Sequence, residues 1–217
     1  MSSWIGTGGT AVTLIKWVCL VALAIAAPAR ADAAAFRLLV LGDSIGAGYG
    51  LPPEQSFPAR LAADLNAAGR GVALIDDSVS GDTSAGGVAR IDDAIHRHPD
   101  AVLLELGAND ALRGIDPAIT FANLDKILSA LAAAHIKIMI LGMRAPANWG
   151  RGYRARFDAI YPRLAAAHHL PLYPFLLDGV ALDPKLNQPD LLHPNAAGAA
   201  LIAARLLPPV EQLIAAP

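Results

Sequence analysis

Short apolar runs alternate with longer segments of helical periodicity from Phe36 to near the end of the chain, and this alternation constrains the fold more than any other feature. The apolar runs typical of strands cover residues 36–41, 72–75, 101–106, 136–141 and 170–173. Apolar residues recur at helical spacing over residues 54–68, 84–95, 117–134, 151–168 and 195–207. Such alternation is typical of parallel βαβ units, and strands that are apolar along their whole length are buried on both faces. The sequence therefore predicts the α/β class, as a three-layer α/β/α sandwich with a central, mostly parallel five-stranded sheet.

The first 31 residues predict an export signal rather than a part of this fold. The apolar run 17–27 is shorter than the roughly 18 residues that a membrane-spanning helix needs. The tripeptide Ala29-Arg30-Ala31 follows, with the small side chains at both ends that a signal peptidase accepts. We therefore expect a signal peptide over 1–31 that is cleaved after Ala31, a single domain over 32–217, and a periplasmic or secreted location. An uncleaved N-terminal anchor is the alternative.

Composition excludes several classes of site. The formal net charge is −2 and the sequence pI is about 6.3, which indicates no basic surface for nucleic acid. The one cysteine, Cys19, lies within the predicted signal, so the mature chain is expected to have neither a disulfide nor a cysteine-rich metal site. The histidine pairs lack acidic residues at ligand spacing, so we expect no metal and no cofactor. We expect a monomer with a small-molecule substrate and no stable insertion in a membrane after cleavage.

Polar and glycine-rich clusters follow the predicted strands, where the carboxyl edge of a parallel sheet would gather them. Ser44 follows the first strand, Gly81 the second and Asn109 the third, while Asp190 and His193 precede the last helix. A serine becomes a nucleophile when a histidine takes its proton and a carboxylate orients that histidine. Ser44, His193 and Asp190 can supply these three roles, because residues three apart project to the same side of one turn. The Ser44 backbone amide, a close backbone approach at Gly81 and the Asn109 side-chain amide could together stabilise an oxyanion.

Five stretches carry a resemblance to a known family: LGDSIGAGYGLPPEQSFPARL (41–61), SVSGDTSAGGVARI (78–91), LELGANDALRGIDP (103–117), MRAPANWGRGYRARFDAIYPRLA (143–165) and DLLHPNAAG (190–198). They resemble the SGNH (GDSL) hydrolase superfamily, and within it most closely the bacterial thioesterase I / lysophospholipase L1 / arylesterase group. The resemblance implies a flavodoxin-like SGNH-hydrolase fold and a catalytic triad. It assigns nucleophile, acid and base to Ser44, Asp190 and His193, and the oxyanion hole to Ser44, Gly81 and Asn109. It also implies two cleft segments with the substrate-binding residues Leu112, Arg113, Gly114, Arg144 and Pro146.

The activity that the resemblance implies is that of an exported serine esterase, which hydrolyses carboxylic esters or thioesters through an acyl-enzyme. An acyl ester or lipid is the expected substrate, as for an arylesterase, an acyl-CoA thioesterase or a lysophospholipase. A carbohydrate or cell-wall O-acetylesterase of the same superfamily and a non-catalytic binding protein on this scaffold are the alternatives. The motif 42–46 also fits the α/β-hydrolase elbow, but that fold places its serine mid-chain and its acid far from the histidine. We expect Asp43 to brace the turn around Ser44.

Overall fold

The computed structural model describes residues 35–216, and the predicted signal peptide over 1–31 lies outside them. The described residues form a five-stranded sheet in the order β2-β1-β3-β4-β5, in which every pairing is parallel. The strands are β1 (Phe36–Gly42), β2 (Val72–Asp76), β3 (Ala101–Glu105), β4 (Lys137–Leu141) and β5 (Leu172–Tyr173). The predicted α/β fold with a parallel five-stranded sheet is therefore confirmed.

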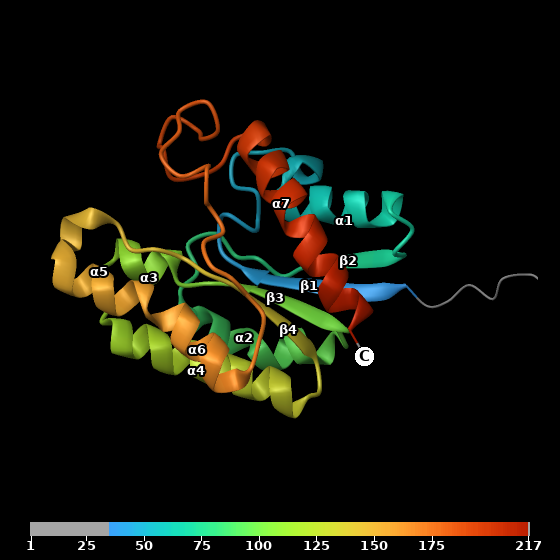
Figure 1. Cartoon of the computed structure of the whole chain (residues 1–217), viewed down its shortest axis with the longest axis horizontal. Helices are drawn as coiled ribbons and strands as arrows, with labels where there is room; N and C mark the ends of the chain where they lie inside the picture. Colours follow the sequence, from blue (N-terminus) through green and yellow to red (C-terminus); the bar gives the residue numbers. More distant parts are fainter. Residues whose placement is uncertain (1–34, 217) are drawn as a thin grey trace, which may run out of the picture. The chain divides into compact units, whose positions relative to one another are not determined.

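Helices cover both faces of the sheet and make the outer two layers (Figure 1). On one face lie α1 (Phe57–Ala67) and α7 (Ala196–Ala215), packed against each other. The other face is covered by α2 (Ser84–His96), α4 (Pro117–Ala133) and α6 (Ile160–His168). The central side chains of β1 and β3 are fully buried between these layers, which explains why the strands are apolar along their length.

The structure moves several predicted helix boundaries, for local reasons. The Ser56 hydroxyl accepts a hydrogen bond from the Ala59 amide at 3.3 Å, so α1 begins after this cap and not at the predicted residue 54. The predicted helix over 151–168 is two helices, α5 (Gly150–Asp158) and α6, because Pro162 lacks an N–H group and its ring clashes with the carbonyl four residues earlier. A short helix, α3 (Ala108–Leu112), follows β3 directly and was not predicted.

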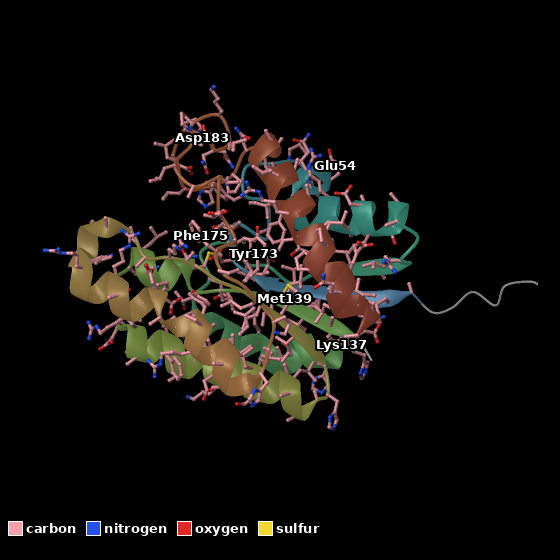
Figure 2. The ribbon with its side chains drawn as sticks, in the orientation of Figure 1. Glu54, Lys137, Met139, Tyr173, Phe175 and Asp183 are labelled. Carbon is pink, nitrogen blue, oxygen red and sulfur yellow. The ribbon has the colours of Figure 1, made fainter. Side chains whose placement is uncertain are left out.

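Helix α7 continues to Ala215, although the periodicity predicted that it ends before the Pro208-Pro209 pair. Val210, beyond the prolines, is fully buried. Lys137 of β4 lies beside the end of α7 (Figure 2) and its ammonium group donates to the carbonyl of Ala216 at 2.7 Å. Core packing and this contact outweigh the local cost of the prolines. By length and composition α7 could cross a membrane, but its apolar face is buried in the core and we interpret it as a core helix.

Candidate active site

Ser44, Asp190 and His193 converge at the carboxyl edge of the sheet. Ser44 lies in a turn just beyond β1, and the other two lie in the segment between β5 and α7. Nε2 of His193 lies 2.9 Å from Oγ of Ser44, and Nδ1 of His193 lies 2.6 Å from Oδ2 of Asp190. The structure thus joins serine, histidine and carboxylate in the order that a nucleophile, a base and an orienting acid require.

Asp190 holds the His193 ring in one orientation and one tautomer. Its Oδ1 accepts hydrogen bonds from the backbone amides of Leu192 and His193 at 2.9 and 3.0 Å. The hydrogen bond with the His193 side chain, helped by these backbone donors, lowers the pKa of Asp190 to about 2. Asp190 is therefore ionised at neutral pH and accepts from Nδ1–H, which leaves Nε2 of His193 to accept the proton of Ser44.

Tyr49 and Gln188 support His193 from a second side, and the sequence analysis identified neither. The centroid of the Tyr49 ring lies 4.7 Å from that of His193, with the planes tilted by 40°. The Gln188 backbone amide donates to the His193 carbonyl at 2.8 Å, and its side-chain amide donates to the Tyr49 carbonyl at 2.5 Å. Gly50, the residue after Tyr49, has no side chain, and a β-carbon there would overlap the Gln188 side chain. This glycine was the one sequence feature that could have indicated the contact between Tyr49 and Gln188.

Three N–H groups are candidate donors to an oxyanion, on Ser44, Gly81 and Asn109. Within residues 35–216, the backbone amides of Ser44 and Gly81 donate to no protein acceptor. Gly81 has a φ of +83°, which favours glycine, and the Arg113 guanidinium donates to its carbonyl at 2.7 Å and holds this peptide in place. The Asn109 side chain, from the first turn of α3, donates one N–H to Oδ2 of Asp43 at 3.1 Å and retains a second. Such free donors beside a nucleophile can stabilise a developing negative charge.

Two fully buried acids, Asp43 and Glu105, support the turn that carries Ser44. Oε2 of Glu105 accepts from the Asp43 amide at 2.9 Å and from the Gly46 amide at 3.1 Å, and Oδ1 of Asp43 accepts from the Ile45 amide at 3.0 Å. Burial raises the pKa of Asp43 to about 6. Burial, together with the Asp43 charge, raises the pKa of Glu105 well above its usual range.

An apolar cavity of about 430 Å³ opens beside Ser44 and His193, a volume in the range of small-molecule sites. Three of the predicted substrate-binding residues, Leu112, Arg144 and Pro146, line it. Phe175 follows β5 and is labelled in Figure 2. The Arg144 guanidinium lies 4.8 Å from the centroid of its ring.

The other two predicted substrate-binding residues, Arg113 and Gly114, are not among the residues that line this cavity, and their assignment stays a prediction. The Arg113 side chain instead donates to the Gly81 carbonyl. Gly114 lies against the Trp149 ring, which a β-carbon would approach to 2.8 Å. Arg113 therefore holds the Gly81 peptide, and Gly114 leaves room for Trp149.

No group of three His, Cys, Asp or Glu side chains among the described residues is arranged to hold a metal ion. The remaining histidines lie mostly at helix ends. His98, His135 and His169 follow α2, α4 and α6 in the left-handed conformation, and His168 contacts Asp125 at 2.7 Å.

The chain is similar in sequence and fold to several known proteins. The sequence model of the GDSL-like lipase/acylhydrolase family matches residues 40–201. The chain is 40% identical to an arylesterase of Vibrio mimicus over 185 residues, which cover 85% of this chain and 88% of the relative. It is 39% identical to thioesterase 1/protease 1/lysophospholipase L1 of Escherichia coli K12 over 183 residues, 84% and 86% of the two chains. Among solved structures, TesA superposes with a TM-score of 0.78 at 36% identity, covering 82% of this chain and 99% of TesA. The SGNH-hydrolase family esterase AlinE4 gives 0.71 at 39% identity, covering 86% and 100%.

Proposed function

Because this chain belongs to the GDSL-like lipase/acylhydrolase family and hydrolyses ester bonds, we propose that it is an exported serine esterase that acts through an acyl-enzyme. The observation that carries the proposal is the hydrogen-bonded chain from Ser44 Oγ through His193 to Asp190. Ser44 and His193 both line the apolar cavity, and among residues 35–216 the backbone amides of Ser44 and Gly81 donate to no protein acceptor. These are the parts that acyl transfer to a serine requires.

In the acylation half of the reaction, Nε2 of His193 takes the hydroxyl proton of Ser44 while Oγ attacks the carbonyl carbon of the ester. The carbonyl oxygen becomes an oxyanion, which accepts from the Ser44 and Gly81 amides and from the Asn109 side chain. His193 then gives its proton to the leaving oxygen or sulfur, and the C–O or C–S bond breaks. The acyl group stays on Ser44 as an ester.

Deacylation repeats these steps with water. His193 takes a proton from the water, whose oxygen attacks the acyl carbon, and the same three donors hold the second oxyanion. The proton returns to Oγ of Ser44 as the acid leaves. Asp190 stays ionised throughout and stabilises the imidazolium that forms twice in each cycle.

The cavity favours carboxylic esters or thioesters with an apolar acyl or aryl group. Its side chains are mainly aliphatic, with the ring of Phe175 among them, and relatives of the chain are named arylesterase, esterase and thioesterase/lysophospholipase. Export rests on the sequence of the first 31 residues. An exported enzyme meets lysophospholipids and small esters rather than coenzyme A thioesters. N-terminal sequencing of the protein recovered outside the cytoplasm should find Asp32 as its first residue, and an intact Met1 there would contradict the proposed cleavage.

Hydrolysis of p-nitrophenyl acetate, butyrate, octanoate and palmitate by the purified protein tests the catalytic proposal. Ser44→Ala should lower kcat at least about 10³-fold, because the nucleophile is removed. Ser129→Ala, an exposed serine of α4, is the matched control and should leave the rate unchanged. Full activity in Ser44→Ala would contradict the assigned nucleophile. A folded protein inactive on all four esters would instead favour a binding protein on this scaffold.

A further inference from the structure

Glu105 is a fully buried acid that the reaction described above does not use. It is the last residue of β3, and its Oε2 accepts from the two backbone amides, of Asp43 and Gly46, that flank the Ser44 turn. Its other oxygen, Oε1, is buried and has no hydrogen-bond donor among the described residues. An oxygen that is buried without a donor is costly for a carboxylate, but it is an ordinary place for the proton of a carboxylic acid.

The neighbouring carboxyl group of Asp43 adds a second reason for that proton. Oε2 of Glu105 accepts from the Asp43 backbone amide at 2.9 Å, so the two residues are neighbours, and both are 0% exposed. Neither forms an ion pair with a cation within residues 35–216. Two adjacent buried carboxyl groups cannot both be ionised at low cost, so the pair holds one proton at neutral pH.

Hydrogen bonding decides which of the two acids holds this proton. Both oxygens of Asp43 already face N–H donors, Oδ1 the Ile45 amide and Oδ2 the Asn109 side chain. Asp43 is thus suited to be the carboxylate. Glu105 has the oxygen without a donor, so it is suited to be the acid, and its O–H can donate to Asp43.

We propose that Glu105 is a neutral acid whose proton holds Asp43 as a carboxylate, and that this pair positions the Ser44 turn and the Asn109 amide for reaction. The inference rests on the proposed function, since it assigns a role toward the oxyanion hole of that site. Asp43 and Glu105 are positioning residues here, because they act through Ser44 and Asn109.

The charge on Asp43 fixes which end of the Asn109 amide faces the substrate. A carboxylate only accepts hydrogen bonds, so the NH₂ group of Asn109 must turn toward it, and the second N–H is then free for the oxyanion. If residue 43 were neutral, the Asn109 amide could rotate and present its carbonyl oxygen to the developing negative charge. An oxygen there would repel the oxyanion instead of stabilising it.

Other groups around Asp43 leave this assignment unchanged. His193 faces Asp43 from the segment before α7, and its positive charge during catalysis favours the Asp43 carboxylate. Arg90 of α2 donates to the neighbouring Gly42 carbonyl at 2.9 Å. Tyr161 of α6 is neutral, since burial raises its pKa well above the usual range, and its hydroxyl donates to the Leu106 carbonyl at 3.0 Å.

Two glycines make the close approach of Glu105 to the Ser44 turn possible. A β-carbon on Gly42 would lie 2.5 Å from Oε2 of Glu105, and one on Gly46 would lie 3.0 Å from the same oxygen. A side chain at either position would push the Glu105 carboxyl group away from the Asp43 amide. The Ser78 hydroxyl also lies close to both positions, so these two glycines leave room for Glu105 and for Ser78.

The test compares Glu105→Gln with Asp43→Asn in the full-length protein, with p-nitrophenyl butyrate as substrate over a range of pH. Glutamine keeps an oxygen for the two backbone amides and an N–H for Asp43, so Glu105→Gln should keep kcat within about threefold. Asp43→Asn should lower kcat by about 10²-fold, the order of a misplaced catalytic group, with KM changed by less than about threefold.

In the wild type, log(kcat/KM) should fall with a slope approaching two on the acid side, because Asp43 and His193 must both be unprotonated. The slope should be one in Asp43→Asn.

A 10²-fold lower kcat in a folded Glu105→Gln variant, or a slope of one in the wild type, would overturn the proposal. Infrared spectroscopy at pH 7.5 gives a readout that does not depend on activity. The wild type should show the band of a protonated carboxylic acid and Glu105→Gln should lack it; absence of the band from the wild type would also overturn the proposal.

Asp110→Asn is the matched control for the loss of a buried acid. Asp110 is 1% exposed and accepts from the Ser84 amide at 2.8 Å, so the change should lower the Tm and keep the slope near two. A slope of one in this variant would contradict the assignment of the second proton to Asp43. Failure of the proposed function can be told apart from failure of the Glu105 proposal. If the proposed function were wrong, the wild type would be inactive or Ser44→Ala would be active, whatever the pH slopes and the infrared band show.

Discussion

Replacing Asn109 by alanine removes the one side-chain donor of the proposed oxyanion hole and leaves the Ser44 and Gly81 amides in place. Loss of one such donor costs roughly 10²–10³ in kcat, or about 2.7–4 kcal/mol of transition-state stabilisation. The Asn109 N–H faces the oxygen that develops charge only after attack, so KM should change by less than about threefold. Asn109→Ala should therefore act on kcat and on kcat/KM by the same factor.

The same change also affects stability, because Asn109 is a partner of Asp43. Oδ2 of the fully buried Asp43 loses the donor that lies 3.1 Å away, which should lower the free energy of unfolding by about 1–3 kcal/mol at neutral pH. The Asn109 hydrogen bond lowers the pKa of Asp43, which burial has raised from 3.8 to about 6. A raised pKa favours the folded state below pH 3.8, and this contribution is lost as the pH rises through 6. Asn109→Ala removes this hydrogen bond and should raise the pKa of Asp43 further. The stability contribution should then be lost at a higher pH, and the fall of activity at acid pH should begin at a higher pH.

Saturation kinetics with p-nitrophenyl butyrate, with thermal unfolding measured in parallel at several pH values, provide the assay. Asn123→Ala is the matched control: this asparagine of α4 donates to the Ser84 hydroxyl at 3.0 Å and does not line the cavity. It should keep kcat within about threefold of the wild type. A kcat for Asn109→Ala that is unchanged, with KM raised, would make Asn109 a substrate-binding residue and refute the reasoning.

Three further changes test other parts of the site. Asp190→Asn should lower kcat by about 10⁴-fold, because an amide no longer selects the Nδ1–H tautomer of His193; a loss of less than tenfold would argue against Asp190 as the orienting acid. Gly46→Ala should lower both kcat and Tm, since its β-carbon would meet Ser78 and Glu105, whereas Gly152→Ala, with open space around it, should leave both unchanged or raise Tm slightly. Leu182→Gly should raise Tm by about 2 °C, because this leucine is 70% exposed with a φ of +65°, and an unchanged or lower Tm would show that the left-handed leucine carries no strain.

The sheet could be predicted from the sequence because the signal is local and repeated. Each buried strand is a short apolar run ended by glycine, proline or a charged residue, and each crossover has the length of a helix. Helix ends were less predictable. The Pro162 break was visible in the sequence, but the continuation of α7 past Pro208-Pro209 depends on core packing and on Lys137, which lies far away in the chain.

The residues of the candidate site could be named from the sequence, because their types and their positions after strands point to one chemistry. The structure brings Ser44, Asp190 and His193 within hydrogen-bond distance. Glu105 was missed because it ends an apolar run, where one acid has no local partner, and Asp43 lies 62 positions away. The direction of the Arg113 side chain depends on the Gly81 loop, and local sequence carries no signal for such a contact.

Trapping of the acyl-enzyme tests the central claim most directly. The wild type, Ser44→Ala and Ser129→Ala are mixed with excess p-nitrophenyl butyrate, quenched in acid within the first turnover, and analysed by intact and peptide mass spectrometry. The account predicts one butyryl group per chain in the wild type and in Ser129→Ala, located on Ser44, and none in Ser44→Ala. A butyryl group on another residue, or its formation at the same rate in Ser44→Ala, would contradict the assignment of Ser44 as the nucleophile.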